Sequence, residues 1–198
     1  MIDFIMILGP TAVGKTRVSV ILAKELNGEI INGDAMQFYR GLDIGTAKIK
    51  ENEKEGINHH LFDLLEAEQS FSVVEYQELV RKKIAEIKAK GKLPIIVGGS
   101  GLYLSSIIDN YLFKGEKRDS EKEAFYAGKT LEKLVEILKL EKPSLAEKTD
   151  LVNRRRVLRA LLKEDDDFQE KLLPYYQNPL IIGLTMNREK LYQRIDDR

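Results

Sequence analysis

The sequence predicts an α/β fold in which helices cover a mostly parallel sheet, and three observations support that prediction. Short apolar runs rich in branched residues alternate with longer segments whose apolar residues recur at helical spacing. Glycine-rich turns follow several of the apolar runs. Alternation of this kind is typical of βαβ crossovers, whose strands are buried on both faces.

The first third of the chain contains three candidate strands and one clear helix. Residues 4–8 are an apolar run closed by a Gly-Pro pair, and residues 15–26 repeat apolar side chains at helical spacing before an Asn-Gly stop. Residues 29–32 predict a second strand that ends at Gly33. Residues 60–64 give a weaker indication of a third strand.

The next signals are those of a capped helix and two further strands. Ser72 and Glu75 form a capping box, which predicts a helix that runs to about Lys90. Residues 93–97 predict a strand, after which a glycine-rich turn leads into a helix that begins near Leu102. The last predicted strand spans residues 180–184.

The middle of the chain has a different composition. Residues 114–171 are polar, strongly charged and helical in pattern, with no candidate strand. We expect them to form a small helical insert in an α/β core made of residues 1–113 and 172–198, with the aspartates 165–167 in a loop. The chain stops inside an apparent helix without a stop signal, so we expect that a C-terminal part is missing.

The composition excludes several classes of protein. There is no cysteine among the 198 residues, which excludes disulfides, a cysteine nucleophile and thiolate metal sites. The 32 basic and 32 acidic residues balance, so any contact with nucleic acid must come from a local patch. No apolar run approaches the roughly 20 residues that span a bilayer, and residues 1–4 show neither the basic region nor the cleavage pattern expected of a signal peptide. We expect a cytoplasmic enzyme, a monomer, with no membrane partner.

A phosphate-binding motif stands between the first strand and the first helix. Residues 9–16 match the P-loop pattern Gly-x-x-x-x-Gly-Lys-Ser/Thr in the strand–helix context that it requires, which predicts a P-loop NTPase-like core. Backbone N–H groups and the helix N-terminus would surround a phosphate, Lys15 would add a mobile charge and Thr16 could hold Mg²⁺. The predicted nucleotide- or diphosphate-binding residues are Gly9, Pro10, Thr11, Ala12, Val13, Gly14, Lys15 and Thr16.

Two further segments are expected beside the P-loop. Asp34 follows the second strand, and residues 98–101 follow the strand at 93–97. The carboxyl ends of parallel strands border the ligand crevice of an open α/β sheet, so these segments should share its rim. A carboxylate there can act as a general base or bind Mg²⁺, although a Gly-Asp pair can also simply form a turn.

An arginine cluster lies in the predicted insert. Residues 153–161 predict a helix, and Arg155 and Arg159 are four residues apart on one face of it. Such a cluster suits a polyanion backbone. An ordinary solvated helix face has the same charge pattern.

Longer segments extend these motifs into a resemblance. Residues 33–48 read Gly-Asp-Ala-Met-Gln-Phe-Tyr-Arg-Gly-Leu-Asp-Ile-Gly-Thr-Ala-Lys, which is far more specific than a P-loop. Similar segments follow in order at residues 59–61, 71–73, 97–103, 155–161, 182–185 and 188–189. Together with the P-loop they resemble the tRNA dimethylallyltransferase (tRNA isopentenyltransferase) family over most of the chain, as a C-terminally truncated member.

The resemblance implies a reaction and a set of roles. The reaction is transfer of a dimethylallyl group from dimethylallyl diphosphate to N6 of an adenine in tRNA, at position 37 beside the anticodon, with Mg²⁺ as cofactor. The P-loop, which the family also uses as an ATP- or nucleotide-binding motif, would hold the diphosphate. Lys15 and Thr16 would act in catalysis, with Thr16 as metal ligand, and Asp34 would be the base. The implied tRNA-binding residues are Asp34, Ala35, Met36, Gln37, Ser100, Arg155, Arg156, Val157, Leu158 and Arg159, and the insert would face tRNA.

Two other functions stay open from the sequence. A small-molecule P-loop kinase would share the α/β core and Lys15, but it would leave residues 34–41 unexplained. An inactive truncated remnant of the transferase would bind phosphate or RNA without turnover.

Overall fold

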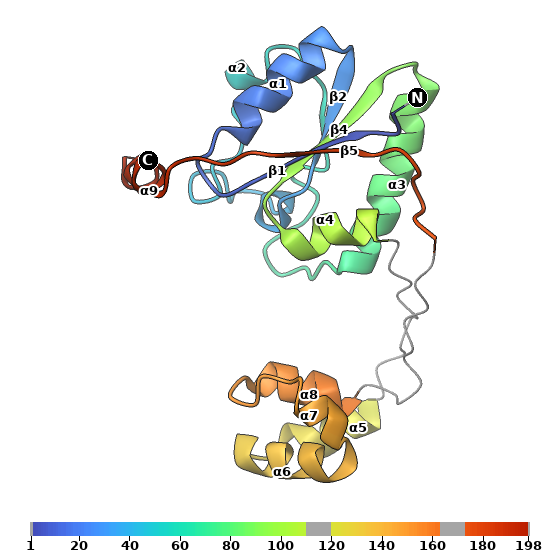
Figure 1. The fold of residues 1–198 in the computed structure, drawn as a ribbon, viewed down its shortest axis with the longest axis vertical. Helices are drawn as coiled ribbons and strands as arrows, with labels where there is room; N and C mark the ends of the chain where they lie inside the picture. The colour runs from blue at the N-terminus through green and yellow to red at the C-terminus, as the bar shows by residue number, and fades with distance from the viewer. Residues whose placement is uncertain (1, 110–119, 163–172, 198) are drawn as a thin grey trace. The chain divides into compact units, whose positions relative to one another are not determined.

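The chain forms two compact units, each with its own hydrophobic core. A computed structural model describes residues 2–109, 120–162 and 173–197. One unit comprises Met1–Tyr111 with Leu172–Arg198, and the other comprises Leu112–Lys171. The first is an α/β unit and the second is helical (Figure 1). The loop expected at residues 165–167 lies outside the described residues.

A five-stranded parallel sheet is the centre of the α/β unit. Its order is β3-β2-β4-β1-β5, and all neighbouring strands pair in parallel. The strands are β1 (Ile5–Leu8), β2 (Gly28–Asn32), β3 (His59–His60), β4 (Leu93–Gly98) and β5 (Leu180–Gly183). The predicted α/β class with a mostly parallel sheet is therefore confirmed.

The third strand is much shorter than the sequence suggested. The apolar run at 60–64 predicted a strand, but pairing with β2 stops at His60. Leu61 and Asp63 adopt positive φ angles of 62° and 53°, which are incompatible with an extended strand. The chain therefore leaves the sheet immediately after His60.

Both faces of the sheet are buried under helices. In β1, Ile5 and Ile7 pack on one face with residues of α1 (Lys15–Glu25), such as Val20. Met6 packs on the other face with Tyr76 of α3 (Val73–Ala89). The remaining elements of this unit are η1 (Ala35–Phe38), α2 (Glu51–Lys54), α4 (Gly101–Ile108) and α9 (Arg188–Asp196).

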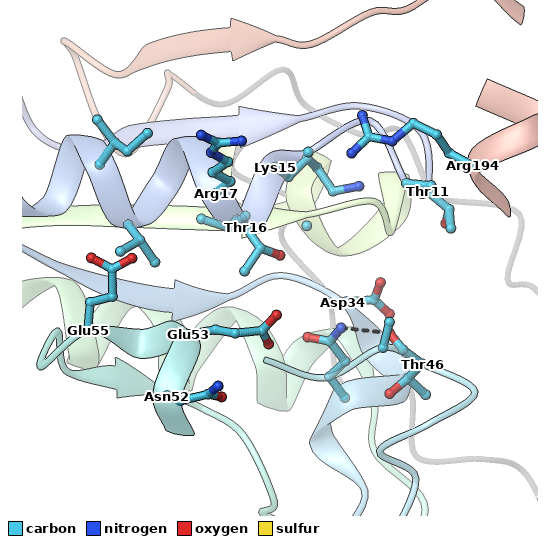
Figure 2. A pocket seen from close by; sticks show the side chains of 18 residues that line it. Thr11, Lys15, Thr16, Arg17, Asp34, Thr46, Asn52, Glu53, Glu55 and Arg194 are labelled. Carbon is cyan, nitrogen blue, oxygen red and sulfur yellow. Dashed lines mark hydrogen bonds between the residues drawn. The ribbon is translucent and has the colours of Figure 1, made fainter. Parts of the chain in front are cut away.

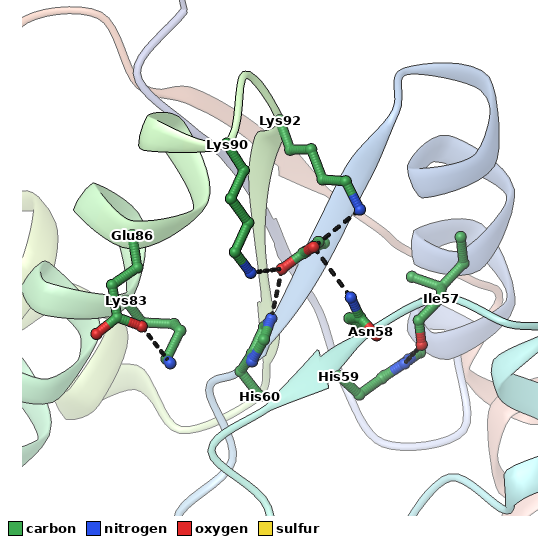
Figure 3. A network of polar contacts seen from close by, with 9 residues as sticks. Ile57, Asn58, His59, His60, Lys83, Glu86, Lys90 and Lys92 are labelled. Atoms are coloured by element: carbon green, nitrogen blue, oxygen red, sulfur yellow. Dashed lines mark hydrogen bonds and ion pairs between the residues drawn. The ribbon is translucent and has the colours of Figure 1, made fainter.

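A buried carboxylate joins the starts of three strands (Figure 3). The side chain of Glu29, 1% exposed, accepts from His60 Nε2 (2.7 Å), Lys92 Nζ (2.9 Å), Asn58 Nδ2 (3.0 Å) and Lys90 Nζ (3.2 Å). Burial raises the pKa of Glu29, but these four hydrogen bonds outweigh it and hold the pKa well below its usual range.

In its described residues, 120–162, the helical unit has four helices around a separate core. These are α5 (Ser120–Ala127), α6 (Leu131–Glu141), α7 (Pro143–Ala146) and α8 (Arg154–Leu162). The core contains Leu134 and Leu138 of α6 and Val157 and Leu161 of α8. Across the described parts of both units, every helix is too short or too polar to cross a bilayer.

Candidate active site

The P-loop wraps tightly from the end of β1 to the start of α1. Gly9 (φ 155°), Ala12 (φ 64°) and Gly14 (φ 105°) all have positive φ, and Gly14 is the N-cap of α1. A Cβ on Gly9 would lie 2.6 Å from the carbonyl oxygen of Leu184, so a larger residue would push the loop off the chain that follows β5. The N-cap of α1 is a glycine without a side chain, so no side chain at that position competes with an anion at the start of the helix.

Lys15 is held above this loop. Its Nζ donates to the carbonyl oxygens of Gly9 (2.8 Å) and Pro10 (2.9 Å). Both acceptors are neutral, and a phosphate oxygen in the loop would accept a stronger, charge-assisted hydrogen bond from the same ammonium group. The Lys15 ammonium group can therefore exchange its hydrogen bonds to the loop carbonyls for hydrogen bonds to a bound anion.

A pocket of about 780 Å³ opens between the P-loop and the chain beyond β2 (Figure 2). Five of the eight predicted phosphate-binding residues line it, namely Thr11, Ala12, Gly14, Lys15 and Thr16. Val13 instead packs inward and is 8% exposed, so its side chain belongs to the core. Asp34 and Gln37 line the same pocket, which brings the predicted base and the predicted phosphate site together.

The backbone around Asp34 is fixed by a buried asparagine. Asn32 Oδ1 accepts from the Asp34 N–H (2.9 Å), and Asn32 Nδ2 donates to the carbonyls of Asp34 (3.1 Å) and Leu61 (3.0 Å). The Asp34 carboxylate accepts from Met36 N (3.2 Å) and so caps η1. Asp34 can therefore form the turn at the start of η1 and line the pocket at the same time.

The chains beyond β2 and β4 touch each other at this edge. A Cβ on Gly98 would lie 2.1 Å from the carbonyl oxygen of Gly33, so only glycine allows the approach. Ser100 Oγ accepts from the Ala35 N–H at 3.1 Å. Ser100 and Ala35, both predicted to face tRNA, are thus bonded to each other, while Met36 beside them is 51% exposed.

Several pocket residues were not predicted. Arg17 follows the P-loop, Asn52 and Glu53 lie in α2, and Arg194 of α9 reaches the pocket beside Thr11 (Figure 2). The pocket therefore has positive charge on its P-loop side from Lys15, Arg17 and Arg194. Arg194 comes from the helix after the last strand, far along the sequence from the P-loop, so no local pattern indicated it.

A nearly buried lysine organises residues 39–48, here called the 39–48 loop. Lys48 Nζ contacts Asp63 Oδ1 (2.6 Å), Asp43 Oδ1 (2.7 Å) and the Tyr39 carbonyl (2.8 Å), with its side chain 6% exposed. Burial lowers the pKa of Lys48, but the two carboxylates outweigh it and raise the pKa above its usual value. The ammonium group therefore stays charged and holds the loop closed.

The pocket offers few protein ligands for a divalent cation. Among the described residues, no three His, Asp or Glu side chains are grouped as a metal site. The side-chain oxygens that line it include the Thr16 hydroxyl and the carboxylates of Asp34, Glu53 and Glu55. This set fits Mg²⁺, which is usually held by one or two protein oxygens, substrate phosphates and water.

The predicted RNA-binding helix is α8, and its apolar residues belong to the helical core. Val157 is wholly buried there and Leu158 packs against that core, so the predicted contact of Val157 with tRNA stays a prediction that its buried side chain does not favour. Arg156 pairs with Asp150 at 3.2 Å. Arg155 and Arg159 are both exposed. These arginines are therefore the residues of the segment that are suited to bind phosphates.

Comparisons with known proteins show which family the chain resembles. The IPP transferase family model matches residues 37–198. The chain is 50% identical over 207 residues to the tRNA dimethylallyltransferase of Bacillus licheniformis and 46% identical over 211 residues to that of Bacillus subtilis. Each match covers 98% of this chain but 65% of the relative, so the chain spans about 65% of the length of these curated relatives.

Solved structures show the same fold. The full-length tRNA isopentenylpyrophosphate transferase of Bacillus halodurans superposes with a TM-score of 0.67 at 43% identity, covering 98% of this chain and 63% of that one. A eukaryotic dimethylallyltransferase, solved acting on tRNA, superposes with a TM-score of 0.85 at 29% identity, covering 98% of this chain and 51% of that one.

Proposed function

The chain belongs to the IPP transferase family, and on this basis we propose that it transfers a dimethylallyl group from dimethylallyl diphosphate to N6 of an adenine in tRNA. The observation that carries the proposal is the pocket shared by Lys15 of the P-loop and Asp34 beyond β2. One wall suits a diphosphate, and the other offers a carboxylate for the proton that the adenine must lose.

The P-loop side would bind and stabilise the departing diphosphate. The N–H groups at the start of α1 and the Lys15 ammonium group face the pocket, and Arg17 and Arg194 add positive charge. Charge builds up on the diphosphate as the bond between its oxygen and allylic C1 breaks. Donors already in position for that charge lower the barrier without reorganising during the reaction.

Asp34 would act as the general base. Adenine N6 is a weak nucleophile because its lone pair is delocalised into the ring, so it must be held in line with C1. As the N6–C1 bond forms, the proton on N6 passes to the Asp34 carboxylate. The adenine must first leave its stack, which costs a few kcal/mol and less in a loop than in a duplex.

Mg²⁺ fits the same arrangement. The Thr16 hydroxyl would be its protein ligand, together with oxygens of the diphosphate. When bound, the ion would neutralise part of the charge of the leaving group.

The arginines of α8 would supply contacts to the tRNA backbone. Arg155 and Arg159 share one face of this helix, while Val157 and Leu161 anchor it in the helical core. Phosphate contacts of this kind position an RNA without reading its sequence.

The test is a transfer assay with labelled dimethylallyl diphosphate and tRNA, run beside labelled ATP with a metabolite panel. Asp34→Asn keeps the shape but removes the base, so diphosphate binding should survive while transfer falls by roughly 10²–10⁴-fold. Asp109→Asn, an exposed aspartate outside the pocket, is the matched control and should behave as wild type.

Each alternative predicts a different result. Transfer of label from ATP to a metabolite would support a kinase, which the family match does not favour. Diphosphate binding with no transfer to tRNA would support the non-catalytic remnant. An Asp34→Asn variant as active as wild type would leave Asp34 as a turn residue only.

A further inference from the structure

The 39–48 loop presents an isoleucine to solvent. Ile44 is 95% exposed, the highest value among the large hydrophobic side chains of the described residues. A Cβ built on Gly41 or on Gly45 would meet no atom within 4 Å, so the chain on both sides of Ile44 also stands clear of the protein. Covering an apolar side chain that is held in water lowers the free energy of the complex, so such a side chain favours binding of a partner.

Ile44 is exposed although its loop is firmly held. The loop closes on itself through Lys48 N to Asp43 O (3.0 Å) and Ala47 N to Ile44 O (3.0 Å). The Lys48 ammonium group also ties Asp43 to Asp63 outside the loop. These contacts keep Ile44 from folding back onto the core, so its exposure is a property of the folded loop.

The same loop forms part of the pocket wall. Thr46 and Ala47 line the pocket, and Gln37 Nε2 donates to the Thr46 carbonyl at 3.0 Å. Ile44 therefore lies two residues from the wall of the proposed active site. A macromolecule that enters the pocket along this wall would pass close to the loop.

We propose that Ile44 packs against an unstacked nucleobase of the RNA substrate and so holds the substrate loop at the mouth of the pocket. This rests on the proposed function, because it assigns a contact to the RNA of that reaction. Single apolar side chains are used in this way to separate neighbouring bases, whose faces are apolar. Single-stranded loops offer such bases.

The shape of the surface favours RNA over a protein partner. A stable protein interface buries about 800 Å² on each side around an apolar centre. Here the exposed apolar side chains of the loop are Ile44 and, to a lesser extent, Leu42 at 39%, and the same loop also exposes the charged Arg40 and Asp43. A small wedge of this kind fits between two bases better than it fits a broad apolar patch.

The test uses an anticodon stem–loop RNA with 2-aminopurine in place of the loop purine next to the target adenine. Its fluorescence reports unstacking, and its titration gives the affinity. Ile44→Asp should weaken RNA binding by about tenfold or more and reduce the fluorescence change, since the apolar contact is lost. Ile44→Leu should keep both, and pyrophosphate binding should be unchanged in every variant.

Ile2→Asp is the matched control, because Ile2 is 42% exposed and precedes β1 at the opposite edge of the sheet from the pocket. If wild type binds and modifies the RNA but Ile44→Asp does so equally well, the inference is wrong and the proposed function stands. If Ile44→Asp instead dissociates a dimer of wild type, the side chain belongs to a protein interface. Failure of wild type to bind the RNA overturns the proposed function as well.

Discussion

Replacing Glu29 by glutamine should destabilise the α/β unit by about 2–3 kcal/mol at pH 7. Removing one partner of a buried ion pair costs about 3–5 kcal/mol, because the other charge is left uncompensated. Here the partner side chains of Lys90 and Lys92 are 51% and 33% exposed, so they can partly return to water and the loss is smaller. His60, with its side chain 19% exposed, loses its acceptor as well.

The direction of the Glu29 pKa shift determines how the stability difference between the two proteins changes with pH. Because the pKa of Glu29 is lower in the folded protein than in the unfolded chain, its stabilisation is complete above the unfolded value of about 4.3 and is lost as the pH falls below it. The advantage of wild type over Glu29→Gln should therefore shrink steadily as the pH falls from 5 to 3, by roughly 1–2 kcal/mol at pH 3.

Thermal unfolding of both proteins from pH 7 to pH 3 measures this difference. A loss of about 2–3 kcal/mol corresponds to a decrease in Tm of roughly 4–12 °C for a chain of this size. The control is Glu86→Gln, which breaks a more exposed ion pair with Lys83 near the Glu29 network (Figure 3). The reasoning fails if the two variants unfold alike at pH 7, or if the advantage of wild type grows on acidification.

Three other substitutions test the remaining parts of the molecule. Lys15→Ala should weaken pyrophosphate binding by about 10- to 100-fold in calorimetry, since a charge-assisted hydrogen bond is lost, and an unchanged affinity would contradict the site. The double variant Arg155→Ala and Arg159→Ala should reduce the salt dependence of RNA binding by about two in log–log slope without changing pyrophosphate binding; an unchanged slope would make this a solvated helix face. Lys48→Met should cost about 1–3 kcal/mol in thermal unfolding at neutral pH, because the raised pKa keeps the lysine charged and paired with Asp43 and Asp63, and equal stability would show that the loop closes without it.

The sheet and the P-loop could be predicted because their signals are local. The runs at 4–8 and 93–97 are short, branched and closed by glycines, and they became β1 and β4 with boundaries shifted by one residue. The capping box at Ser72 also formed, with Ser72 Oγ accepting from Glu75 N at 3.2 Å. In each case neighbouring residues contain all the information that the element needs.

The errors and omissions come from contacts between distant residues. Glu29 is a charged residue in a strand, and its burial depends on lysines more than 60 positions away. Arg194 joins a pocket made largely by the first 55 residues, which no local pattern indicates. Val157 was grouped with its arginine neighbours by segment, although helical periodicity turns its side chain into the core.

The contact between Gly33 and Gly98 has a consequence for the energetics of the proposed reaction. Because the two backbones meet there and Ser100 accepts from Ala35 N, the segments that flank Asp34 cannot move apart without breaking the folded α/β unit. The carboxylate is thus preorganised during folding, and substrate binding need not supply the free energy to assemble this wall. Any induced fit in the pocket would have to arise in another wall, such as α9 with Arg194.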